Sequence, residues 1–276
     1  MTAPLALLVC DVDGTLVDSR KQLSPATIAA VRKLEEAGLP FTLISARPPS
    51  GMFRLAGTLD IAQPMAAFNG GTLFRPDGTI LARHLVDEEV VRGIFALADG
   101  SGATPWLFAD GKWYVRDPGN PHVAHERIAS DSEPVVRADF DGLLGRVDKL
   151  TWVSDDSSAL AKLLADARGA FGTRATIAQS QTYYLDITHP RANKGDGLAA
   201  LAQAIGVDPG AVAVIGDMPN DLPMFARAGL SIAMGQAPAG VRERAGFVTA
   251  SNDDDGVAQA IAAIILPRLA KEGGQA

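Results

Sequence analysis

Short apolar runs alternate with amphipathic segments along the first part of the chain. Residues 5–10 (LALLVC) are apolar without interruption, and residues 41–45 (FTLIS) form a second run that ends in serine. Such runs are typical of central parallel strands, which are covered on both faces. Residues 24–38 begin with Ser-Pro, carry apolar residues on one face and end in glycine, which predicts a helix. This order predicts the start of a doubly wound α/β fold.

Two shorter elements are predicted next. Residues 65–71 (MAAFNGG) indicate a third strand that closes in an Asn-Gly-Gly turn. Residues 72–81 indicate a hairpin, because Pro-Asp-Gly at 76–78 supplies the residues that tight turns favour. The Arg-Pro-Pro sequence at 47–49 indicates a loop after the second strand.

The pattern changes at about residue 87. An amphipathic helix over 87–100 is followed by a hairpin, a polar irregular stretch to about residue 145, another helix and another hairpin. All three tryptophans and all three tyrosines lie in this part, and we expect most of them to form its core. We therefore predict an inserted α+β domain over 87–188, while residues 1–86 and 189–276 form the core domain.

The doubly wound pattern returns after the insert. Residues 193–206 predict a helix, residues 211–216 a buried strand, residues 230–235 a further strand and residues 256–270 a last helix. The fold class that the sequence predicts is α/β, with a doubly wound parallel-sheet core and an inserted α+β domain.

Composition limits the possible partners. The chain has 276 residues, 47% of them hydrophobic, and a net charge of −7, so nucleic acid and anionic membranes are not expected partners. No apolar run approaches the ~18 residues of a membrane helix. A single cysteine excludes an internal disulfide framework. We expect a soluble cytoplasmic protein, either a monomer or a homodimer.

Polar residues follow three of the predicted parallel strands. Asp11 and Asp13 follow the first strand, Ser45 ends the second, and Asp217 follows the strand over 211–216. Ligands of open parallel sheets bind at the carboxyl ends of the strands, so we expect these side chains to converge. Asn220 and Asp221 lie just beyond.

The paired carboxylates require a positive partner or a shared proton. Two carboxylates about 4 Å apart repel by roughly 4 kcal/mol at an effective dielectric constant of 20. Lys194 lies in the first turn of a predicted helix, where free N–H groups also favour an anion. The candidate ligands after these strands include neither His nor Cys, and an all-oxygen ligand set favours Mg²⁺ over zinc.

A calcium-binding loop is excluded as an explanation of the acids. An EF-hand loop that starts at Asp11 needs glycine at its sixth position and glutamate at its twelfth. Leu16 and Gln22 occupy these positions.

Four short motifs resemble those of a known family. In order, DVDGTLVD, ISAR, NKG and GDMPND resemble the motifs of the haloacid dehalogenase superfamily of phosphohydrolases. The insert between the second and third motifs is similar to the large cap of the Cof-like subfamily, and TASNDDDGVA at 249–258 resembles that subfamily's ending. The resemblance implies a Rossmann-like core with a cap that selects the substrate. ISAR departs from the family pattern, since many relatives have Thr and Gly there.

The resemblance implies roles for the acids. Asp11 resembles the nucleophile that becomes an aspartyl phosphate, and Asp13 resembles the general acid that later acts as the base. Asp11, the backbone carbonyl of Asp13, and Asp217 resemble the Mg²⁺ ligands.

Further residues resemble the phosphate-binding and supporting groups. Ser45, Lys194 and Asn220 resemble phosphate-binding residues, while Asp221 resembles the acid that supports the metal or orients Lys194. Other candidates could contact substrate or serve only the fold, and these are Ala46, Arg47, Asn69, Gly70, Gly71 and His189.

Together these features predict a Mg²⁺-dependent phosphatase that acts on small phosphorylated metabolites, with sugar phosphates as the expected class. A phosphomutase on the same scaffold is an alternative. A phospho-accepting signalling domain also gathers acids, a hydroxyl and a lysine on a parallel sheet, but such domains are shorter and carry no cap.

Overall fold

The computed structural model describes residues 4–273, which divide into two compact units. The first unit comprises residues 4–46, Phe53–Leu81 and 193–273. Among the described residues, no helix is both long and apolar enough to cross a membrane.

The second unit comprises Arg47–Met52 and Ala82–Ala192, so the expected insert over 87–188 lies within it. The short segment Arg47–Met52 groups with residues far along the chain because the hydroxyl of Ser50 donates to the carbonyl of Ser130 at 2.5 Å. Sequence patterns gave no indication of this contact.

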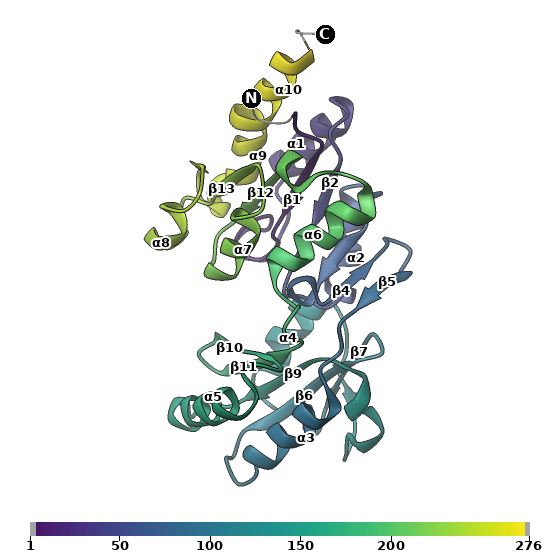
Figure 1. Ribbon diagram of the computed structural model, residues 1–276, viewed down its shortest axis with the longest axis vertical. Helices are drawn as coiled ribbons and strands as arrows, with labels where there is room; N and C mark the ends of the chain where they lie inside the picture. Colours follow the sequence, from purple (N-terminus) through teal and green to yellow (C-terminus); the bar gives the residue numbers. More distant parts are fainter. Residues whose placement is uncertain (1–3, 274–276) are drawn as a thin grey trace. The chain divides into compact units, whose positions relative to one another are not determined.

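A five-stranded parallel sheet forms the centre of the first unit, in the order β14-β13-β12-β1-β2 (Figure 1). Its strands are β1 (Leu7–Cys10), β2 (Phe41–Leu43), β12 (Val212–Gly216), β13 (Leu230–Ala233) and β14 (Phe247–Val248). The first four are almost entirely buried, as the continuous apolar runs predict.

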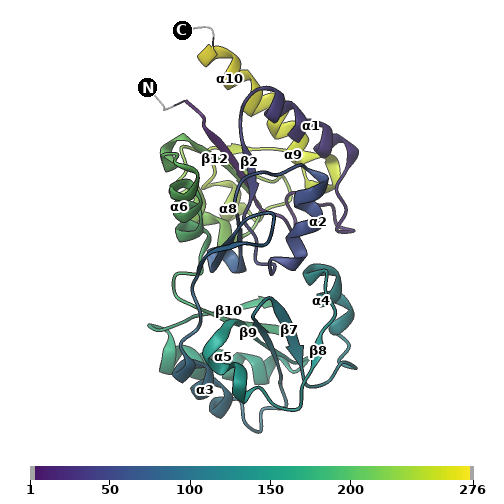
Figure 2. The same cartoon turned by 90° about the vertical axis from the view of Figure 1, so that its right-hand side faces the viewer.

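Helices cover both faces of this sheet (Figure 2). On one face, α1 (Pro25–Glu36) packs beside α9 (Gly256–Ala260), which a π-helical turn continues into α10 (Leu266–Gly273). On the other face, α6 (Lys194–Ile205) packs beside α7 (Leu222–Phe225). The doubly wound α/β core that the sequence predicts is confirmed.

Capping residues set the start of α6, and with it the position of Lys194. The side chain of Asn193 accepts a hydrogen bond from the backbone N–H of Asp196 at 2.9 Å. Such a cap satisfies one of the free N–H groups of a helix start. Lys194 is therefore the first residue of the helix, and Gly206 ends it with a positive φ of 84°.

The third predicted strand differs from expectation. β3 (Met65–Ala67) ends before Asn69, and Phe68–Gly70 form a 3₁₀ turn (η1). β3 forms one isolated bridge, between Ala66 and Ile44, the residue after β2. It pairs instead with β4 (Thr72–Phe74) in a small sheet that also contains β5 (Ile80–Arg83). The extended backbone ends early because Phe68 and Asn69, which directly follow β3, both have positive φ angles, 50° and 58°.

Two helices were not predicted from the sequence. α2 (Ser50–Thr58) follows directly after the Arg-Pro-Pro sequence, and α4 (Val123–Ser130) lies within the polar stretch. The buried residues of α4 include Glu126 and Ser130 beside Val123, so no apolar face reveals this helix in the sequence.

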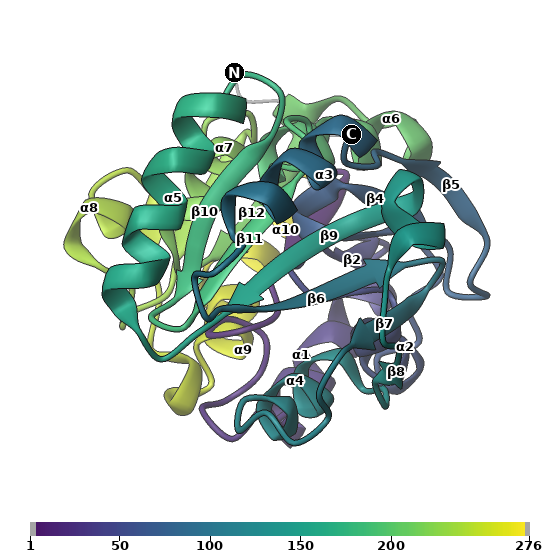
Figure 3. The same cartoon turned by 90° about the horizontal axis from the view of Figure 1, so that it is seen from below.

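A six-stranded sheet organises the second unit, in the order β10-β11-β9-β6-β7-β8. Its strands are β6 (Thr104–Ala109), β7 (Lys112–Val115), β8 (Val135–Val136), β9 (Val147–Val153), β10 (Thr176–Gln181) and β11 (Tyr184–Thr188). α3 (Glu88–Leu97) and α5 (Ser157–Phe171) lie side by side on one face (Figure 3). The tryptophans are buried, as expected for residues of its core.

Two helical glycines provide a matched test of core packing. A Cβ atom on Gly197 would lie 2.7 Å from the Cα of Gly70, so we expect Gly197→Ala to destabilise the protein by roughly 1–3 kcal/mol. Gly57 in α2 has open space around it, and Gly57→Ala should be stabilising by about 0.5–1 kcal/mol. Urea unfolding checks both, and equal effects of the two substitutions would contradict the packing argument.

Candidate active site

Three adjacent strands bring the predicted polar residues to one edge of the core sheet. Asp217 follows β12, Asp11 follows β1, and Ser45 lies two residues beyond β2. The backbone N–H of Asp11 donates to the carbonyl of Ile215 at 3.0 Å, which continues the parallel pairing past the end of β1. The order of the strands in the sheet therefore places the backbone of these three residues at one edge.

A cluster of buried carboxylates lies at this edge. Asp11, Asp217 and Asp221 each offer an oxygen, and these oxygens lie within 4.8 Å of one another. The ammonium group of Lys194 donates to Oδ1 of Asp11 and to Oδ1 of Asp221, both at 2.5 Å. Lys194 is 1% exposed, so its charge depends on these two partners.

Asp221 connects Lys194 to the turn after β12. While its Oδ1 accepts from Lys194, its Oδ2 accepts from the backbone N–H groups of Asp217 and Met218 at 2.8 and 2.9 Å. A Cβ atom on Gly216 would lie 2.5 Å from Cγ of Asp221, so only glycine permits this approach. Asp221 thus orients Lys194 and fixes the backbone that carries Asp217.

The loop after β1 packs against Asp217. Gly14 has a φ of 78°, and a Cβ atom there would overlap the Asp217 carboxylate. The hydroxyl of Thr15 donates to Oδ1 of Asp217 at 3.2 Å. Gly14 and Thr15 of the DVDGT sequence therefore help to position Asp217, and Gly14 also permits the tight turn after β1.

The carboxylate of Asp13 lies outside the buried cluster that the described residues form. Its Oδ1 accepts a hydrogen bond from the ammonium group of Lys21 at 2.7 Å. The side chain of Asp13 is 34% exposed, whereas that of Asp11 is 7% exposed, so Asp13 is the more accessible acid.

Burial and repulsion give the cluster an affinity for positive charge. Burial raises the pKa of Asp11, although Lys194 opposes the shift, and burial together with Asp221 raises the pKa of Asp217. Burial disfavours the charged form of Lys194, but Asp11 and Asp221 outweigh it and raise the pKa of Lys194 above its ordinary value.

The three carboxylates and one ammonium group carry two net negative charges when all are ionised. A divalent cation would balance them, and carboxylate oxygens suit a hard metal ion. The cluster can therefore hold a metal ion.

Known proteins resemble this chain along most of its length. The haloacid dehalogenase-like hydrolase family matches residues 8–261. The chain belongs to this family.

Relatives of this haloacid dehalogenase-like hydrolase are named as phosphatases. One from Haemophilus influenzae, named a putative phosphatase, is 27% identical over 90% of this chain and 94% of its own length. A 5-amino-6-(5-phospho-D-ribitylamino)uracil phosphatase from Bacillus subtilis is 27% identical over 91% and 95%. The predicted class, a phosphoric monoester hydrolase, is confirmed.

A solved structure confirms the fold of the hydrolase. A haloacid dehalogenase-like hydrolase from Bacteroides thetaiotaomicron superposes with a TM-score of 0.87 at 27% identity, covering 95% of this chain and 100% of the other. The family resemblance in the sequence motifs is thus confirmed.

Two of the predicted phosphate-binding residues, Ser45 and Asn220, contact the η1 turn. The carbonyl of the buried Ser45 accepts from the backbone N–H of Asn69 at 2.7 Å. Oδ1 of Asn69 accepts from the side-chain amide of Asn220 at 3.1 Å. Asn69 therefore links the end of β2 to the turn after β12, and three candidates from distant motifs lie in one network.

Gly70 and Gly71 have a structural role in the same turn. A Cβ atom on Gly70 would lie 2.5 Å from the Cα of Gly197, and Gly70 has a φ of 97°. Gly71 donates its backbone N–H to the carbonyl of Phe68 at 3.1 Å. Ala46 is exposed, and a contact of these three residues with substrate stays a prediction.

Arg47 and His189 belong to the second unit. Arg47 is buried and donates from Nη1 to the carbonyl of Gly51 at 3.1 Å. The ring of His189 stacks on that of His84, and its Nδ1 accepts from the backbone N–H of Arg191. Burial and Arg191 lower the pKa of His189. Substrate contacts of both residues stay predictions.

Sequence reasoning missed three residues that contact the candidate site. Thr15 stands in the DVDGT sequence, and that position was a usable signal. Lys21 pairs with Asp13, but nothing in the pattern of its neighbours indicates this. Gln236 donates to the carbonyl of Gly14 from a segment 222 residues away, so only the folded chain reveals it.

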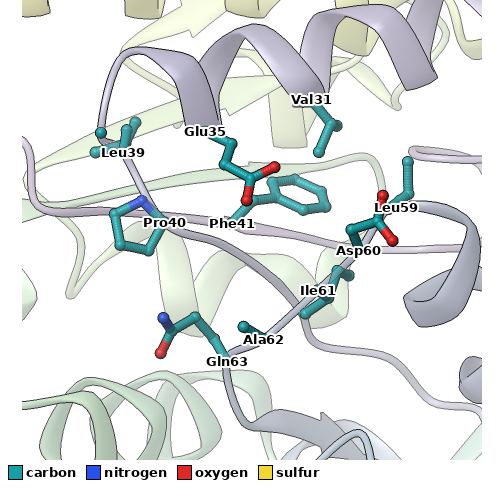
Figure 4. A pocket seen from close by; sticks show the side chains of 11 residues that line it. Val31, Glu35, Leu39, Pro40, Phe41, Leu59, Asp60, Ile61, Ala62 and Gln63 are labelled. Carbon is teal, nitrogen blue, oxygen red and sulfur yellow. The ribbon is translucent and has the colours of Figure 1, made fainter.

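A pocket of about 250 Å³ lies away from this edge of the sheet (Figure 4). It is formed by the end of α1, the start of β2 and residues 59–63, and Glu35 and Asp60 lie among its lining residues. β2 begins at this pocket and leads toward Ser45 at its other end. Within the described chain, its lining includes none of the predicted site residues, so we assign the chemistry to the acid cluster.

Proposed function

We propose that this haloacid dehalogenase-like hydrolase is a Mg²⁺-dependent phosphatase of small phosphorylated metabolites that acts through an aspartyl phosphate at Asp11. The observation that carries the proposal is the ammonium group of Lys194, held at 2.5 Å from both Asp11 and Asp221 beside Asp217. This contact holds the Asp11 carboxylate, the proposed nucleophile, next to a fixed positive charge.

In the first step, a carboxylate oxygen of Asp11 forms a bond to phosphorus while the bond between phosphorus and the leaving oxygen breaks. Lys194 holds the carboxylate in one orientation, and positioning of this kind lowers the barrier. Asp13 donates a proton to the leaving alcohol, which suits its greater exposure.

In the second step, water attacks phosphorus and gives its proton to Asp13. The bond between phosphorus and Asp11 breaks, inorganic phosphate leaves and the carboxylate of Asp11 is restored. Asp13 is thereby protonated again for the next substrate.

The metal ligands in this proposal are the carboxylates of Asp11 and Asp217 and the backbone carbonyl of Asp13. Mg²⁺ would supply positive charge to the phosphoryl oxygens. Both oxygens of Asp221 already accept hydrogen bonds, which supports an orienting role for this residue.

The remaining roles in the proposal are those that the family resemblance implies. Ser45, Lys194 and Asn220 bind the phosphoryl group, and the inserted domain, residues 87–188, selects the leaving group. Sugar phosphates are the expected substrate class, and the name of the Bacillus subtilis relative, which contains a phosphorylated ribityl group, supports this choice.

Metal dependence tests the proposal directly. We expect hydrolysis of an aryl phosphate to fall to background in chelator and to return with added Mg²⁺, because the uncompensated acids would repel the phosphate. Asp217→Asn should raise the Mg²⁺ concentration needed for half-maximal activity. Full activity in chelator, or recovery with zinc alone, would contradict the proposal.

The two acids after β1 should respond differently to substitution. Asp11→Asn should abolish turnover, since the nucleophile is lost. Asp13→Asn should lose ~10²–10⁴-fold on an alkyl phosphate and clearly less on an aryl phosphate, whose leaving group needs little protonation. Steady-state kinetics on both substrates measures this, and equal losses would remove Asp13 from proton transfer.

A further inference from the structure

The loop that carries Asp13 is fastened by residues from the end of the chain. Nε2 of Gln236 donates to the carbonyl of Gly14 at 2.5 Å, and Nδ2 of Asn252 donates to the carbonyl of Val17 at 3.0 Å. The backbone N–H of Ser19 donates to Oδ1 of Asp253 at 2.8 Å. We call Gln236, Asn252 and Asp253 the C-terminal anchor.

Hydrogen bonds connect two members of the C-terminal anchor to each other and order the turn that carries Asn252 and Asp253. The backbone N–H of Asn252 donates to Oε1 of Gln236 at 3.2 Å, so Gln236 both accepts from the anchor and donates to the loop. The hydroxyl of Ser251 donates to Asp254 at 2.6 Å, and the N–H of Gly256 donates to the carbonyl of Ser251. The anchor is therefore a preorganised surface for the loop.

The loop closes on itself as well. Oδ1 of Asp18 accepts from the backbone N–H groups of Arg20 and Gln22 at 2.9 and 2.8 Å. This turn carries Lys21, whose ammonium group contacts Asp13 at 2.7 Å. The internal bonds fix the shape of the loop, while the anchor fixes where that shape lies on the core.

Asp13 depends on this loop more than the other acids do. Asp11 and Asp217 directly follow buried strands, and Lys194 and Asp221 hold their surroundings, so the hydrogen bond from Thr15 is only one of several contacts that place Asp217. Asp13 lies two residues further on, with a third of its side chain exposed. Proton transfer requires a separation near 3 Å, and a displacement of ~1 Å can cost about 10²-fold in rate.

We propose that the C-terminal anchor is a positioning device for Asp13. It holds the loop of residues 14–19 against the core, so that the Asp13 carboxyl group meets the leaving oxygen. The inference rests on the proposed proton-transfer role of Asp13. It also gives a physical function to the TASNDDDGVA sequence, because Asn252 and Asp253 lie within it.

Single substitutions test the anchor contacts one at a time. Gln236→Glu keeps the size and the acceptor for Asn252 but loses the donor to Gly14. Asp253→Ala loses the acceptor for Ser19, whereas Asp253→Asn keeps an acceptor oxygen. Gln203→Glu, at an exposed position of α6, controls for the added charge. Asp13→Asn provides the reference pattern.

The experiment measures kcat and KM for an alkyl and an aryl phosphate at saturating Mg²⁺, with the melting temperature of each variant. We expect Gln236→Glu and Asp253→Ala to lose roughly 10–100-fold in kcat on the alkyl phosphate and less than about threefold on the aryl phosphate. KM should change little, and Asp253→Asn and Gln203→Glu should behave as the parent enzyme.

Equal losses on the two substrates, or no loss, would overturn the inference, because a merely structural role does not distinguish leaving groups. A lower melting temperature with equal losses on the alkyl and the aryl phosphate would also overturn the inference. If Asp13→Asn itself shows no difference between substrates, the proposed role of Asp13 fails. If Asp13→Asn shows the difference and the anchor variants do not, only the anchor's role fails.

Discussion

The ammonium group of Lys194 is the interaction on which the candidate site depends. It lies buried between Asp11 and Asp221, and loss of Lys194 would leave these two carboxylates buried without a compensating charge. Removing one member of a buried ion pair typically costs 3–5 kcal/mol. The same contact orients Asp11, the proposed nucleophile, and in that proposal it places positive charge where the phosphoryl group would gain negative charge. Stability and catalysis therefore constrain these residues together.

The fold places the residues of this contact at the carboxyl ends of two strands and at the N-terminus of a helix. Parallel strands β1 and β12 deliver Asp11 and Asp217 to one edge, and the Asn193 cap places Lys194 at the first turn of α6. Glycine at 14 allows the turn after β1 to approach Asp217, and glycine at 216 allows Asp221 to approach the backbone of its own turn. The buried acids still repel, and a divalent cation is the simplest way to balance them.

Much of this arrangement was predictable because the signals are local. Continuous apolar runs followed by Asp or Ser identify parallel strands and their carboxyl ends, and Asn193 before Lys194 indicates a helix start. Contacts between distant segments leave no such signal: Gln236 meets Gly14 from 222 residues away, and Ser50 meets Ser130. α4 escaped prediction because polar residues occupy its buried face. Any substrate contacts of residues such as Ala46 and Arg47 also leave no local signal in the sequence.

The central claim is that Asp11 becomes covalently phosphorylated, and chemical trapping tests it most directly. The enzyme is mixed with an aryl phosphate and Mg²⁺, quenched in acid during turnover and treated with borohydride, which reduces an acyl phosphate to an alcohol. Peptide mass spectrometry then locates the reduced residue. The account predicts reduction at Asp11, in larger amount in Asp13→Asn, because water attack on the intermediate is slowed. Reduction at another carboxylate, or none at Asp11 in either protein during turnover, would contradict it.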